Sequence, residues 1–153
     1  MVFVRTPRFF VPLLAVALSA CGHGGGAAAP KGWQAIPGAP TAWTSGSGAA
    51  VQEYRYLTTP FEGTLADLAS TVTIDVLLHH RGARLHGSVV PFAPCPGAAG
   101  VATFTLPEGS ALEAGFTLRN GQAVRTTYTR PAGSAADPNV ADAMRESLCI
   151  APG

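Results

Sequence analysis

The stretch GTLADLASTVTIDVLLHH, residues 63–80, decides how the chain is organised, because it carries the clearest periodic pattern in the sequence. Thr64 and Asp67 have the spacing of a helix capping box, with the carboxylate in place of the usual Glu or Gln. The apolar residues that follow recur every three or four positions, as on one face of a helix: Leu65, Leu68, Ala69, Val72 and Val76. The β-branched run at 71–74 alone would also suit a strand. The whole stretch predicts a helix over 65–79 that ends near Gly82.

Strand patterns lie on both sides of this helix. Before it, residues 41–45 and 50–59 are rich in strand formers and are separated by the turn Gly46-Ser47-Gly48. In the second of these strands, Tyr54 and Tyr56 share one face. The other face is predicted to carry Val51, Glu53, Arg55 and Leu57. After the helix, four more strand patterns cover residues 83–92, 101–106, 112–121 and 122–130, with Asn120-Gly121 as a strong hairpin signal.

The last element is predicted to be a helix. Asp137 is placed to cap its N-terminus and Pro138 to occupy its first turn. Its apolar stripe consists of Val140, Met144 and Leu148. The predicted order is therefore β-β-α-β-β-β-β-α, which indicates an α+β domain with an antiparallel sheet of about six strands and two packed helices.

This order, together with GWQAIPG (32–38) and GTLADLA (63–69), resembles the Mog1/PsbP-like fold over roughly residues 33–150. Members of that group include a Ran-binding protein, an extrinsic photosystem subunit and many bacterial lipoproteins. The resemblance implies binding or assembly work rather than catalysis. It carries over no binding residue, because the group shares a shape rather than a site.

The first twenty residues have the parts of a secretory signal peptide. Arg5 and Arg8 give a positive start, and residues 9–18 form an apolar run that is too short to span a bilayer. Leu18-Ser19-Ala20-Cys21 then resembles the lipobox of bacterial lipoproteins, a family in which the cysteine sulfur receives a lipid and the chain is cut before the cysteine. The resemblance implies that residues 1–20 are removed and that Cys21 is the lipidation site. The alternative is an ordinary secreted protein with a free Cys21 thiol.

The residues after Cys21 extend this expectation. Gly22 follows the cysteine, which by analogy favours the outer membrane in bacteria with two membranes. Residues 21–31 are rich in Gly and Ala and are predicted to form a flexible tether. Residues 32–153 are predicted to form a single domain, which suits a chain of 153 residues.

Lipidation of Cys21 would account for the odd number of cysteines, three. Cys95 and Cys149 then remain in an oxidising compartment, and we expect them to form a disulfide. Two buried thiols, or half of a metal site, are the alternatives. A metal site is disfavoured because neither cysteine has a CxxC partner or a nearby histidine.

Two groups of side chains could bind a ligand. Trp33 and Trp43 are expected in the core, and a stacking surface for sugars or aromatic ligands is the alternative.

The second group is HHRGARLH, residues 79–86, in which three imidazoles could bind zinc or copper. Adjacent His79 and His80 point in different directions on a helix or a strand, so a helix end followed by a strand is the favoured interpretation. His80 and His86 would be the metal pair if a metal binds. An anion on Arg81 and Arg84 is a further alternative.

Charge and motifs limit the function. Eight basic and nine acidic residues remain after Cys21, which argues against nucleic-acid binding. The sequence has no GxSxG motif and no evident nucleophile with a base, and its dispersed acids suit surface charges: Glu53, Glu62, Asp67 and Asp75. We predict no catalytic residue and no cofactor. We expect a lipid-anchored, non-enzymatic envelope protein that binds a protein partner or supports an assembly. The alternative is a lipoprotein that binds a small ligand or a metal.

Overall fold

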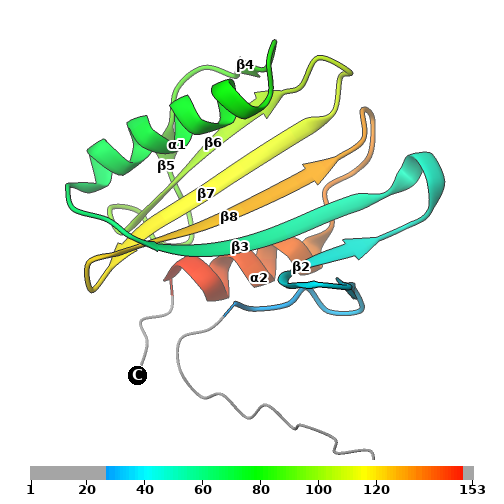
Figure 1. The fold of residues 1–153 in the computed structure, drawn as a ribbon, viewed down its shortest axis with the longest axis horizontal. Coiled ribbons are helices and arrows are strands. Elements are labelled where there is room, and N and C mark those ends of the chain that lie inside the picture. The colour runs from blue at the N-terminus through cyan, green and yellow to red at the C-terminus, as the bar shows by residue number, and fades with distance from the viewer. Residues whose placement is uncertain (1–26, 150–153) are drawn as a thin grey trace, which may run out of the picture.

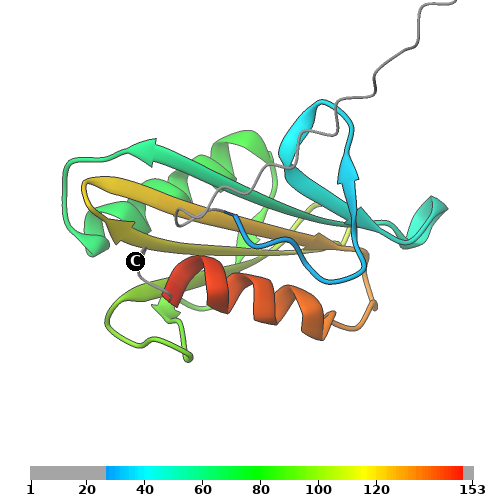
Figure 2. The ribbon, with the colours of Figure 1, turned by 90° about the horizontal axis from the view of Figure 1, so that it is seen from below.

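A computed structural model describes residues 27–149. The predicted signal peptide, the lipidation site Cys21 and the tether residues up to 26 lie outside the described residues. Within the described range, the chain forms an eight-stranded antiparallel sheet with one helix on each face (Figures 1 and 2). The predicted α+β class and the antiparallel sheet are therefore confirmed.

The sheet joins elements that are far apart in the sequence. Its order is β1-β2-β3-β8-β7-β6-β4, and β5 pairs with β6. The long pairing of β3 with β8 brings the first half of the domain beside the last strand. The strands are β1 (Gln34–Ile36), β2 (Ala39–Ser45), β3 (Gln52–Pro60), β4 (Arg84–Leu85), β5 (Val90–Pro91), β6 (Ala99–Thr105), β7 (Ala111–Arg119) and β8 (Gln122–Arg130).

Both predicted helices are present. The helix α1 (Leu65–His79) begins with the predicted capping box: Asp67 N–H donates to Thr64 Oγ1 at 3.2 Å, and Thr64 N–H donates to Asp67 Oδ2 at 2.8 Å. The Thr64 backbone N–H and hydroxyl both donate to the Asp67 carboxylate, and these two hydrogen bonds lower the pKa of Asp67. The helix α2 (Pro138–Cys149) begins after Asp137, whose Oδ1 accepts a hydrogen bond from the backbone N–H of Asn139 at 2.8 Å. Local capping chemistry therefore fixes both helix starts.

The predicted strand over 83–92 is wrong. The chain instead forms β4 and β5, which both pair with β6 but are separated by a break. Gly87 lies in this break with a left-handed φ of +66°, which interrupts an extended strand. This split and the unpredicted β1 raise the strand count from about six to eight. By contrast, Asn120 and Gly121 both have positive φ and form the predicted hairpin turn.

The core on the α2 side is aromatic. Trp43 stacks on Tyr54 with their ring centroids 5.8 Å apart, and Trp33 meets Tyr128 edge-on at 6.2 Å. Trp43 is buried in the core, as predicted, whereas Trp33 is partly buried and packs against it. The buried members of this cluster are Trp43, Tyr54, Tyr56, Ala99, Val124, Tyr128, Val140, Ala143, Met144 and Leu148.

Two further features border this core. Ala27 and Ala28 pack against it, so the packed chain begins at least five residues before the predicted domain boundary at 32. Cys95 and Cys149 lie beside the end of α2 with their sulfurs 2.05 Å apart, which is the predicted disulfide. We call residues 27–33 the terminal segment. Its first residues and the disulfide thus hold the same end of α2.

The core on the α1 side is aliphatic with two phenylalanines, and α1 packs mainly on β6 and β7. Its buried members are Leu68, Val72, Val76, Ala102, Phe104, Leu106, Leu112, Ala114, Phe116 and Ala123. Because α1 sits over β6 and β7, the neighbouring strands β8 and β3 are left open on this face.

Candidate functional site

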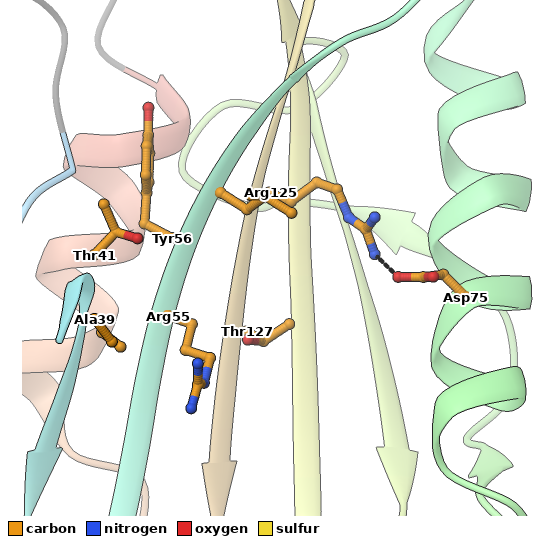
Figure 3. Close-up of a pocket in the computed structure, with 9 residues that line it drawn as sticks. Ala39, Thr41, Arg55, Tyr56, Asp75, Arg125 and Thr127 are labelled. Carbon is orange, nitrogen blue, oxygen red and sulfur yellow. Dashed lines mark hydrogen bonds and ion pairs between the residues drawn. The ribbon is translucent and has the colours of Figure 1, made fainter. Parts of the chain in front are cut away.

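The open part of the sheet forms a groove beside α1. Its floor comes from β3 and β8, one wall is α1, and the other wall is β2 (Figure 3). Two adjoining hollows of about 290 and 430 Å³ make up this groove. They share Arg55, Asp75, Arg125 and Thr127. We call this feature the α1-side groove.

Strand alternation explains which side chains form the floor. In β3, Tyr54 and Tyr56 are buried on the α2 side, so the intervening Arg55 projects to the α1 side. The register places Arg55 opposite Thr127, and Leu57 opposite Arg125. The predicted division of this strand into a tyrosine face and a charged face is confirmed for residues 53–57, while Val51 lies just outside the strand.

An ion pair crosses the groove. Arg125 Nη2 on β8 donates to Asp75 Oδ2 on α1 at 2.5 Å, and only 16% of the Arg125 side chain is exposed (Figure 3). The Nδ1 atom of His79 lies 2.8 Å from the backbone carbonyl oxygen of Asp75 and 3.2 Å from its Oδ1. Asp75 therefore links the floor of the groove to the last turn of α1.

A second ion pair lies on β3 itself. Arg55 donates a hydrogen bond from Nε to Glu53, and this bond raises the pKa of Arg55. Positive and negative charges alternate along the groove as a result. Such a surface suits a ligand that offers both a carboxylate and hydrogen-bond donors.

Apolar side chains are exposed on the same side of the sheet as these charges. Leu57 on the floor is 50% exposed, and Ile74 and Leu78 on α1 are 56% and 70% exposed. Leu78 lies one turn after Asp75, on the same side of the helix. Among the described residues, six large hydrophobic side chains are exposed, and four of them belong to this side of the sheet: Leu57, Ile74, Leu77 and Leu78.

The histidines near the end of α1 have separate partners. His80 lines the groove, whereas the Nε2 atom of His86 forms a hydrogen bond with Thr105 on β6. Within residues 27–149, no group of three or more His, Cys, Asp or Glu side chains is placed to hold a metal ion. Arg81 and Arg84, the suggested anion site, are exposed residues after α1.

The four acids that were predicted to be surface charges also lie apart from one another. Glu53 and Asp75 both line the groove, while Asp67 caps α1 and Glu62 is exposed before it. Glu53 and Asp75 are each paired with an arginine. The arrangement favours ligand recognition by paired charges.

Sequence reasoning missed Arg125 and the role of Arg55. Alternation within each strand shows which face each arginine takes. The pairing of β3 with β8, which brings the two together, has no local signal in the sequence.

No protein-family model matches the sequence, and no curated protein is significantly similar to it. None of the helices within residues 27–149 has the length and apolar character needed to cross a bilayer.

Proposed function

We propose that the protein is a lipid-anchored, non-enzymatic interaction module of the bacterial cell envelope, which binds a protein partner through the α1-side groove. The lipobox residues 18–21 support the anchor and the envelope location, and Gly22 favours the outer membrane where there are two. The antiparallel sheet with one helix on each face supports the proposal of a Mog1/PsbP-like fold.

One observation carries the binding proposal: within residues 27–149, four of the six exposed large hydrophobic side chains lie on the α1 side of the sheet, and one of them, Leu57, lines the charged groove. Apolar patches rimmed by polar groups are typical of protein-interaction surfaces. The partner should be a protein segment that covers Ile74 and Leu78 with apolar side chains. It should also offer a carboxylate that can reach Arg55 or Arg125.

The experiment is site-specific photo-crosslinking in intact cells of the producing bacterium. A photoreactive amino acid replaces Leu57 or Leu78 in the full chain, and a control replaces Asp142 on the outer face of α2, whose side chain is 76% exposed. We expect one discrete adduct from positions 57 and 78, and none from position 142. An Arg125→Glu substitution should remove the adduct at position 57.

Equal adducts from all three positions, or none from the groove, would contradict the interaction module. The anchor is tested separately by the mass of the mature chain. Diacylglycerol on Cys21 should be present in the natural chain and absent from Cys21→Ser.

The alternative is that the α1-side groove holds a small polar ligand. The hollow of about 290 Å³ lies at the lower end of the volumes of small-molecule sites. Native mass spectrometry of the Cys21→Ser protein from the periplasm tests this. An added mass that disappears on denaturation, and that Arg125→Glu abolishes, would favour the small ligand over the protein partner.

A further inference from the structure

The described chain begins beside the last turns of α2. The backbone N–H of Ala28 donates to Ser147 Oγ at 3.3 Å, and Ala27 packs against the same core. Six residue steps separate Ala27 from Cys21. A chain of that length spans at most about 20 Å. A lipid on Cys21 would therefore hold this end of the domain close to the bilayer.

An uncharged loop lies across the same end of α2. Residues 87–98 include β5 and the connection to β6, and the Cys95–Cys149 disulfide attaches them to the last residue of α2. The sequence contains no Asp, Glu, Lys or Arg from 87 to 107. Phe92 packs toward the α2-side core, whereas Val90 is 49% exposed. We call residues 87–98 the apolar loop.

The apolar loop borders a separate hollow of about 260 Å³, outside the α1-side groove. This hollow lies between the loop and the first turns of α1. Every residue that lines this hollow is apolar or glycine, including Leu65, Ala66 and Val89. Gly100 leaves room for the Phe116 ring beside this hollow, because a Cβ at position 100 would lie only 2.5 Å from Cζ of Phe116. This surface has no polar side chain that would identify a soluble ligand.

We propose that the apolar loop lies on the surface of the bilayer that holds the lipid anchor. The inference rests on the lipid anchor of the proposed function. The surface that the loop contacts is a phospholipid bilayer, because the apolar loop and the residues nearest the anchor both lie at the last turns of α2. The tether also keeps the effective concentration high, so a weak contact is sufficient. Apolar side chains such as Val90 would enter the boundary between headgroups and acyl chains.

This placement leaves the α1-side groove free. The apolar loop lies beside β6, on the flank of α1 that carries Ala66 and Ala69. The groove lies on the other flank, which carries Asp75 and faces β8 and β3. The domain could therefore contact the bilayer and a protein partner at the same time.

The test uses two matched valines at opposite ends of the sheet. Val90 is 49% exposed in the apolar loop, and Val51 is 43% exposed at the β2–β3 connection, which Figure 1 shows at the far end of the molecule. Each is replaced by Trp in the full acylated chain, purified from membranes. The vesicles contain phosphatidylethanolamine, phosphatidylglycerol and brominated phosphatidylcholine, whose bromines quench a nearby indole.

We expect the emission added by Val90→Trp to fall by roughly half on brominated vesicles, and the emission added by Val51→Trp to stay unchanged. Equal quenching at both positions, or none at either, would overturn the inference. Flotation with the vesicles is measured in parallel, with Cys21→Ser as the control. An acylated chain that fails to float would overturn the anchor itself, whereas flotation without selective quenching overturns only the loop contact.

Amide hydrogen exchange on the unsubstituted chain gives a second measurement that does not depend on how the variants fold. Exchange in residues 87–98 should slow when the acylated protein is bound to vesicles, relative to soluble Cys21→Ser. Exchange in residues 46–51 should not change. Equal exchange of residues 87–98 in the two states would also overturn the inference.

Discussion

The two faces of the sheet share their strands but are closed to different degrees. On the α2 side, Tyr54, Tyr128 and Leu148 are almost completely buried, and the terminal segment and the disulfide add further cover. On the α1 side, the helix covers β6 and β7 and leaves the charged floor of β8 and β3 open. One strand, β3, presents tyrosines to the closed face and arginine to the open face.

This difference indicates that the closed face mainly stabilises the domain and that the open face is available for recognition. Burial of apolar surface is the main stabilising term in folding, and α2 buries its whole apolar stripe against the sheet. The helix α1 buries one stripe but also exposes Ile74 and Leu78, which contribute little to folding. Substitutions on the closed face should therefore change the free energy of unfolding, and substitutions on the open face should change binding.

Removal of the disulfide is expected to have the largest effect. Cys95 and Cys149 are separated by 54 positions, and closing a loop of that length contributes about 4 kcal/mol in the chain-entropy account. The Cys95→Ser/Cys149→Ser domain should lose about this much free energy of unfolding in a urea titration. Reducing agent should destabilise the unsubstituted domain similarly and leave the double variant unchanged. An unchanged unfolding midpoint would show that the closed face is held by packing alone.

Truncation of one leucine on each face compares the faces directly. Leu148 is 2% exposed and Leu78 is 70% exposed. Leu148→Ala should lower the free energy of unfolding by about 3 kcal/mol, since it leaves a cavity under α2. Leu78→Ala should change it by less than about 0.5 kcal/mol. Similar losses for the two variants in the same urea titration would refute the division of roles.

Asp137 joins the terminal segment to the closed face and should make that junction sensitive to acid. Burial raises the pKa of Asp137, but hydrogen bonds from Trp33 Nε1 and from Asn139 outweigh it, and the net pKa is lowered. A lowered folded-state pKa means that the contribution is complete above the unfolded value of about 3.9 and is lost as the pH falls through the folded pKa. Trp33 emission should therefore change below about pH 4.

Two variants separate the charge of Asp137 from its capping role. Asp137→Ala should cost about 1 to 2 kcal/mol at neutral pH, because it removes the N-cap of α2. Asp137→Asn should keep most of that stability and lose this residue's share of the acid transition. An acid transition that is identical in the natural chain and in Asp137→Asn would assign it to another carboxyl, such as Asp67.

Local sequence patterns predicted the helix starts and the hairpin turn. The features that they missed depend on longer-range structure. The caps at Thr64 and Asp137 and the turn at Asn120-Gly121 are local, and all three were predicted correctly. The break at Gly87 was missed because the flanking residues look like one strand. The groove was missed because it requires β3 beside β8, and nothing within either strand specifies its neighbour.

The smallest expected effect tests whether the closed face is free of defects. Thr126 is 1% exposed on the α2 side, and its Oγ1 has no hydrogen-bond partner among residues 27–149. The opposing residue is Gly115, where a Cβ would lie 2.6 Å from that oxygen. A buried hydroxyl without a partner is unfavourable, so Thr126→Val should raise the free energy of unfolding by about 1 kcal/mol.

The next residue of the same strand is the control. Thr127 points to the open groove, and Thr127→Val should change the free energy of unfolding by less than about 0.5 kcal/mol. The adjacent pair differs only in the face to which the hydroxyl points, so any difference in stability reports the environment of that face. If Thr126→Val destabilises the domain, the buried hydroxyl must have a partner on the α2 side. The closed face would then contain a polar contact of its own, and its stability would not come from apolar packing alone.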